Sequence, residues 1–434
     1  MRHGGVARAD DSIGSMSLVS SLACKIRRIW STVVAVVAMA VITVFTAAVT
    51  AQAKPSGDDP SGYAQRDEVR EFIATMAADH DFDATKLARL FAQAQTQNSA
   101  IRAMSAPMTA PPKWFEYAPS FLSQERINGG IAFRDRHRAL LERAEREYGV
   151  PTEVIVAIIG VETFYGRVSG RYRVFDALTT LAFDYPRRAE FFREELKQFL
   201  LLTREWNMSP LSPKGSFAGA MGLPQFMPTS FRRYAIDFDN DGRIDLWTNI
   251  GDVVGSVANF LSRHGWQKGQ PALLPAMAEA NEAKRAVGEG GLSERREYLA
   301  WTAINIAVAD PLAVEIDPHW MAALVQLDEA DGPKYRLGFN NFYVLTRYNR
   351  SRLYASAVWD LAQAIARAET TQQSQVSRSA ASIVAHPDRA TRESPRRAPR
   401  STHRSLRATT RPSAPSRCQP RASCQARHPT GRTS

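Results

Sequence analysis

The sequence predicts a mainly α-helical protein of the α+β class, and three observations lead to this class. Apolar side chains recur at helical spacing in successive stretches between residues 61 and 264. From Gly265 to Asn341 this periodicity weakens, glycine and proline become frequent, and short segments such as Leu312–Ile316 and Ala322–Leu327 are typical of strands. All 3 cysteines lie outside residues 54–375, so burial alone must hold this body together.

The N-terminus has the features of a targeting segment. Lys25, Arg27 and Arg28 precede an apolar run, Trp30–Ala51, which ends in the small-x-small pattern that a signal peptidase cleaves. We therefore expect residues 1–53 to direct export to the periplasm. Two outcomes stay open for residues 30–51, because a run of roughly 20 residues is either removed after Ala53 or retained as an inner-membrane anchor.

The net charge of +11 is concentrated at the two ends of the chain. Residues 376–434 hold 13 arginines against 2 acids, and the first 53 residues carry +3, which leaves residues 54–375 at −3. The body therefore offers no basic patch, and no nucleic-acid partner is expected. Residues 370–434 are rich in Arg, Ser and Pro and are predicted to be a disordered tail, either an arm for polyanions or a solvated extension.

Helices follow one another through the body, each justified by apolar spacing and local end signals. Gly149 is typical of a helix end and Pro151 of the start of the next helix, which runs to Glu162. The other predicted helices are Ser61–Met76, Asp83–Gln95, Asn128–Tyr148, Arg188–Leu202, Ile250–His264 and Ser351–Ala368.

Glu162 ends the apolar run VIVAIIGVETFYGR and shares a helical face with Ile155, Ile158 and Ile159. A carboxylate on such a face is partly desolvated, which raises its pKa and lets it hold a proton near neutral pH. This is the property of a general acid. Spacing alone also fits a core-edge glutamate paired with an arginine.

Lys214–Gln225 reads KGSFAGAMGLPQ, a loop of small residues that lets a backbone approach a ligand closely. Ser216 and Gln225 supply hydrogen-bonding groups of the kind that sugars require. The same composition is also common in ordinary turns.

Residues 237–245, DFDNDGRID, match the EF-hand calcium loop. Acids stand at loop positions one, three, five and nine, and Arg243 stands at position seven, where the ligand is a backbone carbonyl. Thr248 replaces the usual glutamate at position twelve, and Asp252 is the nearest acid that could substitute for it. The expected metal ligands are Asp237, Asp239, Asp241, Arg243, Asp245 and Asp252. The alternative is an empty, hydrogen-bonded Asx turn.

The motifs IIGVETFYGRVSG, LAFDYPRRAEFF, GSFAGAMGLPQFMPTSFRRYAIDFDNDGRIDLW and FYVLTRYNRS resemble the lytic murein transglycosylase B family over roughly residues 64–368. The resemblance implies a lysozyme-like helical core with an EF-hand-like loop, an extra α-helical region and a small β subdomain. The implied boundaries are 60–145 with 345–368 for the helical region, 146–266 for the core, 237–252 for the loop, 267–344 for the β subdomain and 370–434 for the tail.

The resemblance also implies roles for individual residues. Glu162 corresponds to the sole catalytic acid/base, and Phe191 stands where relatives are expected to have Tyr, so a hydroxyl contact is lost there. The remaining expected substrate-binding residues are Tyr117, Arg187, Arg188, Ser216, Met221, Gln225, Phe226, Tyr343 and Tyr348. No cofactor is expected for the chemistry, while a structural Ca²⁺ or Na⁺ is expected in the loop.

The implied activity is cleavage of the β-1,4 bond between N-acetylmuramic acid and N-acetylglucosamine in peptidoglycan, leaving a 1,6-anhydromuramoyl end. Ordinary glycosidases need two carboxylates, whereas here the substrate supplies the nucleophile. One alternative is a hydrolytic muramidase that uses Asp176, Asp184 or Glu190 as a second acid. Another is an inactive wall-binding protein. The expected partners are glycan strands, and the protein is expected to be a monomer.

Overall fold

The computed structural model describes residues 61–106, 111–312 and 314–385. The chain divides into two compact units, Met1–Ser374 and Gln375–Ser434, and the elements below lie in the first unit except where α16 continues beyond it. The predicted targeting segment 1–53, with its apolar run 30–51, lies outside the described residues, as do Cys24, Cys418 and Cys424. None of the described helices is long and apolar enough to cross a membrane.

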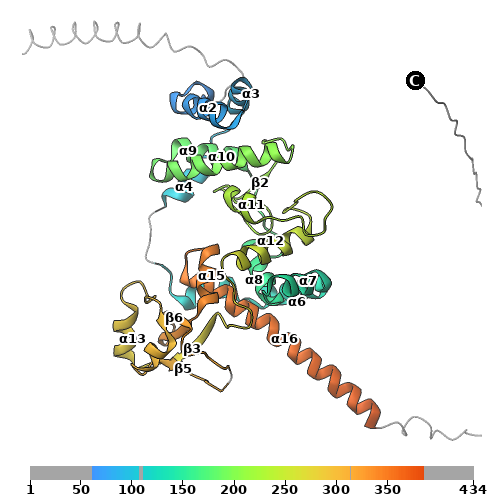
Figure 1. Cartoon of the computed structure of the whole chain (residues 1–434), viewed down its shortest axis with the longest axis vertical. Coiled ribbons are helices and arrows are strands. Elements are labelled where there is room, and N and C mark those ends of the chain that lie inside the picture. Colours follow the sequence, from blue (N-terminus) through green and yellow to red (C-terminus); the bar gives the residue numbers. More distant parts are fainter. Residues whose placement is uncertain (1–60, 107–110, 313, 386–434) are drawn as a thin grey trace, which may run out of the picture. The chain divides into compact units, whose positions relative to one another are not determined.

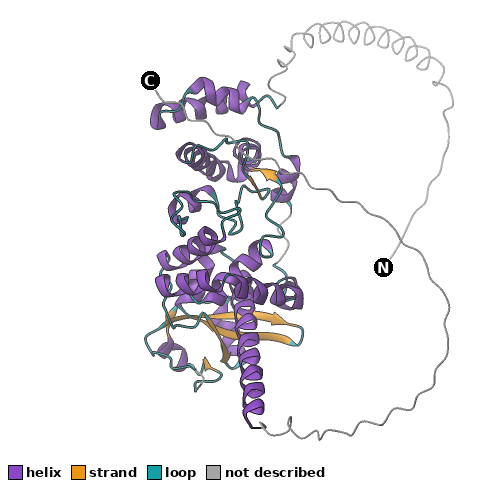
Figure 2. Ribbon diagram, turned by 90° about the vertical axis from the view of Figure 1, so that its right-hand side faces the viewer, coloured by secondary structure: helices purple, strands orange, loops and turns teal. Residues whose placement is uncertain are grey.

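Helices dominate the described part of the chain, and a five-stranded sheet gathers most of its strands (Figure 1, Figure 2). The predicted class, mainly helical with a small β part, is therefore confirmed. The first elements are η2(Tyr63–Gln65), α2(Asp67–His80), α3(Ala84–Phe91), α4(Asn98–Ser105), α5(Trp114–Tyr117) and η3(Ala118–Ser120).

The predicted helix Ser61–Met76 starts later than expected. Gly62 has a left-handed φ of 69°, a short 3-10 turn follows, and Arg66 is extended, so α2 begins only at Asp67. The start of α3 follows the expected pattern, because the Asp83 carboxylate accepts a hydrogen bond from the Lys86 N–H at 3.0 Å.

The helical core follows in the sequence. Its helices are α6(Gln124–Arg136), α7(Arg138–Tyr148), α8(Thr152–Thr163), α9(Val174–Asp184), η4(Pro186–Arg188), α10(Ala189–Glu205), α11(Pro228–Tyr234) and α12(Ile250–Arg263). Helix α6 packs on α8, α7 on α12, and α10 on both α9 and α11. The range Asn128–Tyr148, predicted as one helix, is divided at His137, whose φ of −113° and ψ of 23° are not helical.

The small β part contains five antiparallel strands in the order β4-β6-β7-β3-β5. Its elements are β3(Leu273–Met277), α13(Ala280–Val287), β4(Arg296–Glu297), α14(Tyr298–Thr302), β5(Ala307–Val308), β6(Met321–Glu329) and β7(Gly332–Gly338). The predicted strand Ala322–Leu327 lies within β6, and Leu324 pairs with Leu337 of β7.

The predicted strand Leu312–Ile316 is wrong for the residues of that range that the structure describes. Leu312 follows a turn in which its N–H donates to the Asp310 carboxylate at 3.3 Å, and its side chain is 96% exposed. An aliphatic run without a sheet partner or a buried face does not form a strand.

Two strands and two helices complete the fold. The strands β1(Tyr172–Arg173) and β2(Lys214–Gly215) pair antiparallel beside the loop of small residues. Helix α15(Asn340–Tyr348) precedes α16(Arg352–Ala385). Helix α16 therefore continues into the range assigned to the tail, where residues 371–385 include alanines and glutamines, which favour helix. Residues 386–434 lie outside the described part.

Candidate active site

Glu162 lies at the C-terminal end of α8, after the buried stretch Val154–Gly160. Phe164 and Tyr165 have left-handed φ angles of 52° and 60°, which end the helix directly after Thr163. The Tyr165 hydroxyl donates to the Arg126 carbonyl at 2.9 Å. A Cβ at Gly160 would come within 2.5 Å of this hydroxyl, so glycine there gives the Tyr165 ring room to fix the turn behind Glu162.

Three tyrosines surround the Glu162 carboxyl group. Tyr354 of α16 donates a hydrogen bond from its hydroxyl to Glu162 Oε1 at 2.6 Å. Burial and the charge of Glu162 raise the pKa values of Tyr117 and Tyr348, which also places these two side chains near the carboxylate. The carboxyl group thus has aromatic side chains from α5, α15 and α16 in its neighbourhood.

Burial raises the pKa of Glu162 to about 7, and the hydrogen bond from Tyr354 acts in the opposite direction. No charged side chain in the described part of the chain contributes to this shift. The core-edge alternative required an arginine partner, and the described residues provide none for Glu162. Near neutral pH the group can therefore both donate and accept a proton.

The loop of small residues is hydrogen-bonded to residues that neighbour Glu162. The Thr163 hydroxyl donates to the Leu223 carbonyl at 3.1 Å, and the Tyr348 hydroxyl donates to the Pro224 carbonyl at 2.7 Å. The next residue, Gln225, has a φ of 52° and donates from its side chain to the Ser169 carbonyl at 3.3 Å. The loop backbone is thus fixed on both sides by neighbours of Glu162.

Other expected binding residues of this loop are partly committed to its own structure. The Ser216 hydroxyl accepts hydrogen bonds from the Ala218 and Ala220 N–H groups at 3.2 and 3.0 Å. Met221 is buried and exchanges backbone hydrogen bonds with Phe226. The Phe226 ring lies 5.8 Å from the Tyr348 ring, so this loop meets the tyrosines through an aromatic contact.

The remaining expected substrate-binding residues lie on η4, α10 and α15. Arg187 and Arg188 are exposed on η4, and the Arg188 guanidinium lies 4.2 Å from the centre of the Phe191 ring. Tyr343 is 39% exposed on α15, and the guanidinium groups of Arg295 and Arg347 lie 4.7 and 4.2 Å from the centre of its ring.

Of the three carboxylates considered as a second acid, Asp176 and Asp184 have other partners. Asp176 is buried and accepts from Arg173 Nε at 2.6 Å, while Asp184 pairs with Arg66. Glu190 is exposed in the first turn of α10. Asp176 and Asp184 serve to join the N-terminal helices to α9, because Gln95 and Tyr63 also donate to them.

Tyr354 is the one contact of Glu162 that sequence reasoning missed. Its spacing from Val358, Leu361 and Ile365 matches the buried face of α16, so it reads as a core residue, and it is only 4% exposed. The quoted motif FYVLTRYNRS also ends just before it. A tyrosine on an otherwise aliphatic buried face needs a hydrogen-bond partner for its hydroxyl. This need is the feature of the sequence that could have indicated a polar contact of Tyr354.

The acidic loop brings part of the expected ligand set together. Asp237, Asp239 and Asp252 each offer an oxygen atom, and these atoms lie within 4.8 Å of one another. Asp241 and Asp245 lie outside this cluster and accept N–H groups of the loop backbone, from Arg243 and Trp247, each at 2.8 Å. Three converging carboxylates provide the hard oxygen donors that Ca²⁺ prefers.

Asp252 holds the acidic loop to α12. It is buried and accepts hydrogen bonds from the Phe238 and Asp245 N–H groups, each at 2.8 Å. Burial raises its pKa, whereas the Asn249 amide lowers the pKa of Asp239. Gly242, with a φ of 87°, allows the sharp turn between the acids.

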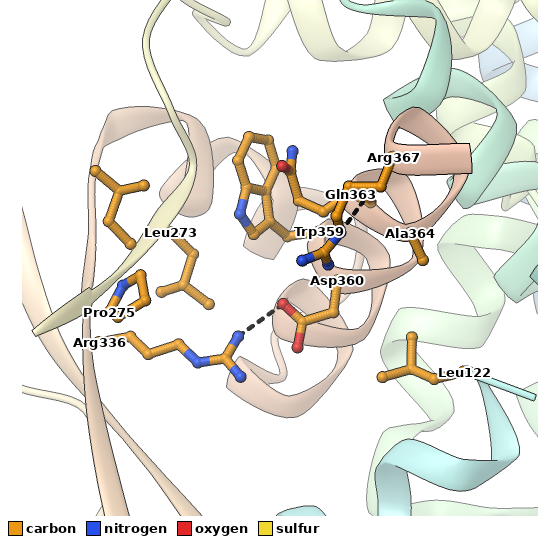
Figure 3. A pocket seen from close by; sticks show the side chains of 10 residues that line it. Leu122, Leu273, Pro275, Arg336, Trp359, Asp360, Gln363, Ala364 and Arg367 are labelled. Carbon is orange, nitrogen blue, oxygen red and sulfur yellow. Dashed lines mark hydrogen bonds and ion pairs between the residues drawn. The ribbon is translucent and has the colours of Figure 1, made fainter. Parts of the chain in front are cut away.

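A separate pocket of about 430 Å³ lies between β3, β7 and α16 (Figure 3). Its aromatic wall is Trp359, and its charged groups are Arg336, Asp360 and Arg367, of which Arg336 and Asp360 form an ion pair at 2.7 Å. Arg336 and Asp360 compensate each other, which leaves the charge of Arg367 at the edge of this pocket.

A half-buried carboxyl group with a pKa of about 7, placed in a helical core beside a loop of small residues, has the properties expected of the acid/base group of a glycoside-cleaving enzyme. The comparison with known families shows to which family within this class the chain belongs. The family of the transglycosylase SLT domain matches residues 64–363, and the chain belongs to this family. The protein is a lytic transglycosylase of SltB type that cleaves peptidoglycan.

Individual relatives support this assignment. The chain is 42% identical over 315 residues to the membrane-bound lytic murein transglycosylase B of Escherichia coli, covering 70% of this chain and 84% of the relative. The solved structure of SltB1 from Pseudomonas aeruginosa is 46% identical, with a TM-score of 0.65, over 70% of this chain and 99% of that one. Slt35 from Escherichia coli in complex with calcium is 41% identical, with a TM-score of 0.63, over 72% and 95%.

Proposed function

We propose that Glu162 alone supplies both the acid and the base of the reaction. The supporting observation is its environment: burial raises its pKa to about 7, and no second carboxylate shares the cluster of Tyr117, Tyr348 and Tyr354 in the described residues. A group half protonated near neutral pH suits a reaction in which the same residue first gives and then takes a proton.

The proposed reaction has two proton transfers and no water. Protonated Glu162 donates to the glycosidic oxygen as the bond from C1 of the muramoyl unit to that oxygen breaks. An oxocarbenium-like centre develops at C1. The ionised carboxylate then removes the proton of the C6 hydroxyl as O6 attacks C1, which closes the 1,6-anhydro ring and restores protonated Glu162.

The neighbours of Glu162 have proposed roles in orientation and binding. Tyr354 fixes the carboxyl group through its hydrogen bond. The loop containing Ser216, Met221, Gln225 and Phe226 binds the sugar, since Thr163 and Tyr348 hold its backbone beside the acid. Its small residues leave room for a close approach of the glycan. Further sugar contacts are proposed for Tyr117, Tyr343, Arg187, Arg188 and Phe191.

We propose that the acidic loop holds a structural Ca²⁺ through Asp237, Asp239 and Asp252, supported by their converging oxygens. The calcium complex of the related Slt35 is consistent with this ion. Bound Ca²⁺ would relieve repulsion among the three carboxylates and tie the loop to α12. The chemistry at Glu162 needs no cofactor.

We propose export to the periplasm, with residues 30–51 either removed or retained as an anchor, and action as a monomer on glycan strands that carry peptides. The sequence of the first 53 residues supports export. SltB3 from Pseudomonas aeruginosa, 30% identical with a TM-score of 0.62, was solved with NAG-NAM-pentapeptide, which supports a peptide-bearing substrate. The mass of the protein purified from its membrane and soluble fractions distinguishes cleavage from retention.

The reaction type is tested by mass spectrometry of digested peptidoglycan. Products with 1,6-anhydromuramoyl ends are expected, whereas products with only reducing muramic ends would contradict the single-carboxylate mechanism. Asp176→Asn, Asp184→Asn and Glu190→Gln should each leave the anhydro products unchanged. A loss of cleavage in one of them, with the fold intact by circular dichroism, would favour the hydrolytic alternative.

A further inference from the structure

The turn directly behind Glu162 has a strained backbone. Phe164, Tyr165 and Gly166 have consecutive positive φ angles of 52°, 60° and 88°. The left-handed region is open to glycine but strained for a residue with a bulky side chain. Strained residues persist only where their surroundings hold them, and they cluster at functional sites. The contacts that hold this turn therefore bear on the position of Glu162.

Arg126 of α6 supplies several of these contacts. Its guanidinium lies 4.5 Å from the centre of the Phe164 ring, and its backbone carbonyl accepts the Tyr165 hydroxyl at 2.9 Å. Its Nη1 donates to the Gly160 carbonyl in the last turn of α8. A cation at this end of a helix also interacts favourably with the helix dipole. One side chain thus holds both the end of the helix that carries Glu162 and the turn that follows it.

The same guanidinium reaches the segment that follows Tyr117. Its Nη2 donates to the Ser120 carbonyl at 3.2 Å, and its central carbon lies 5.5 Å from the centre of the Phe121 ring. The Phe121 ring in turn lies 4.8 Å from the Tyr117 ring. Arg126 therefore joins the two parts of the chain that bring Glu162 and Tyr117 together.

The place of Arg126 has a cost in free energy. Its Nε is buried without a hydrogen-bond partner, and burial lowers the pKa of the guanidinium. The adjacent acid, Glu125, pairs with Arg167 at 2.6 Å. An unsatisfied buried donor next to a strained turn is a combination that proteins retain at functional sites rather than for stability.

We propose that Arg126 is a positioning residue, which holds the left-handed turn so that the carboxyl group of Glu162 stays at the Tyr354 hydroxyl. This inference rests on the proposed function, because it concerns the acid/base group of that reaction. Arg126 exchanges no proton, and its charge does not contribute to the pKa of Glu162. It acts on the carboxyl group through geometry.

Removal of the guanidinium should release the strain. Phe164 and Tyr165 can then leave the left-handed region, and the last turn of α8 can rearrange with them. Glu162 Oε1 lies only 2.6 Å from the Tyr354 hydroxyl, so a small displacement breaks this hydrogen bond. Because the bond lowers the pKa of Glu162, its loss should raise that pKa.

The first test is Arg126→Met, which keeps an apolar stem and removes the guanidinium. This variant should lower kcat about tenfold or more, since a small misplacement of an acid slows proton transfer strongly. KM should stay within about twofold, because Arg126 is not proposed to contact the sugar. The fall of kcat/KM with pH should move to higher pH.

Arg167→Met is the matched control. The Arg167 guanidinium also lies 4.5 Å from the centre of the Phe164 ring, but it is exposed and pairs with Glu125. This variant should leave kcat and the pH of the fall unchanged. Equal effects of Arg126→Met and Arg167→Met would overturn the proposal, because the hydrogen bonds to the two carbonyls would then be irrelevant.

The double variant Arg126→Met/Tyr354→Phe separates three explanations. If Arg126 acts through the Tyr354 hydrogen bond, the double variant should show the same pH shift as Tyr354→Phe alone. Two shifts that add would indicate a direct effect of the charge and overturn the proposal. A loss of kcat/KM by the same factor at every pH, with no shift, would indicate a merely structural role and would also overturn it.

A carbon-13 NMR titration of protein with labelled glutamate reads the pKa of Glu162 without any substrate. The Glu162 signal is the one missing in Glu162→Gln, and its midpoint in wild type should lie at about pH 7. Arg126→Met should raise this midpoint, and an unchanged midpoint would contradict the proposal. If circular dichroism shows that Arg126→Met does not fold, Arg126→Lys takes its place, because a lysine keeps the charge but cannot bridge the two carbonyls.

The NMR titration also separates this proposal from the proposed function. If the wild-type protein forms no anhydro ends, the single-carboxylate mechanism fails, while the titration still reports whether Arg126 positions Glu162. If anhydro ends form and the titration midpoint is the same with and without the guanidinium, the mechanism stands and the positioning role fails.

Discussion

The end of α8 and the acidic loop between α11 and α12 place the same functional group in opposite surroundings. Glu162 is alone among tyrosines and receives one hydrogen bond, from Tyr354. Asp237, Asp239 and Asp252 converge on one another and accept several backbone and amide N–H groups. Isolation and burial make a carboxyl group a proton donor, whereas convergence makes a set of carboxylates a cation site. The number of acids matters less than what surrounds them.

The largest expected effect is on Glu162 itself. Glu162→Gln keeps the volume and the hydrogen bond to Tyr354 but removes the proton that must be transferred, so cleavage should fall by about 10³-fold or more. Release of soluble muropeptides measures the change. Glu195→Gln is the matched control, because Glu195 is also buried with a raised pKa but accepts the Thr229 N–H. Equal losses of cleavage in Glu162→Gln and Glu195→Gln would contradict the role of Glu162 as the acid.

The acidic loop should make the stability of the protein depend on Ca²⁺. Ca²⁺ at about 100 times its Kd should raise the free energy of unfolding by about 2.7 kcal/mol, since it binds only the folded state. Asp252→Asn should abolish most of this Ca²⁺-dependent increase, as measured by thermal unfolding with and without chelator. Asp331→Asn, in the β6–β7 turn, is the control. An undiminished response in Asp252→Asn would exclude Asp252 as a ligand.

The isolation of Glu162 should also reduce stability at high pH. Its pKa is about 7 in the folded state, against an ordinary value of 4.5 for a glutamate. The folded state therefore holds the proton more tightly, and stability falls as pH rises from about 4.5 to 7. Glu162→Gln should be more stable than wild type by about 1 to 3 kcal/mol at pH 8, with little difference at pH 4. Denaturant titration at pH 4 and pH 8 measures the free energies of unfolding of both proteins. A difference that does not change with pH would show that burial does not raise the pKa of Glu162.

The smallest expected effect concerns the hydrogen bond to Glu162. Because an acid must be protonated in the free enzyme, kcat/KM should fall as pH rises through about 7. The bond from Tyr354 lowers this pKa, so Tyr354→Phe should move the fall to higher pH and lower the rate about tenfold. Tyr348→Phe should leave the pH of the fall in place, since Tyr348 donates to Pro224. The pH profiles of kcat/KM for wild type, Tyr354→Phe and Tyr348→Phe measure these shifts, and an unshifted profile of Tyr354→Phe would contradict the effect of this hydrogen bond on the pKa.

Elements that depend on a local pattern were predicted from the sequence, whereas elements that depend on contacts distant in the sequence were not. The helix ending at Glu162, the helix following Asn249 and the strand Ala322–Leu327 were predictable because periodicity and end signals lie within each segment. The division at His137 was missed, since the apolar positions on either side continue one pattern. The strand predicted at Leu312–Ile316 failed because strands depend on partners that a local pattern cannot supply.

The sequence by itself determined the class of fold, the family, Glu162 as the candidate acid and the acidic loop, because these depend on residue type and short spacing. Only the tertiary structure decided what surrounds them. Tyr354 lies 192 positions from Glu162 in the chain, and Asp252 meets Asp237 across the turn into α12. The guanidinium groups of Arg295 and Arg347 meet at the ring of Tyr343. Desolvation and charge pairing depend on distance in space, and packing alone sets that distance.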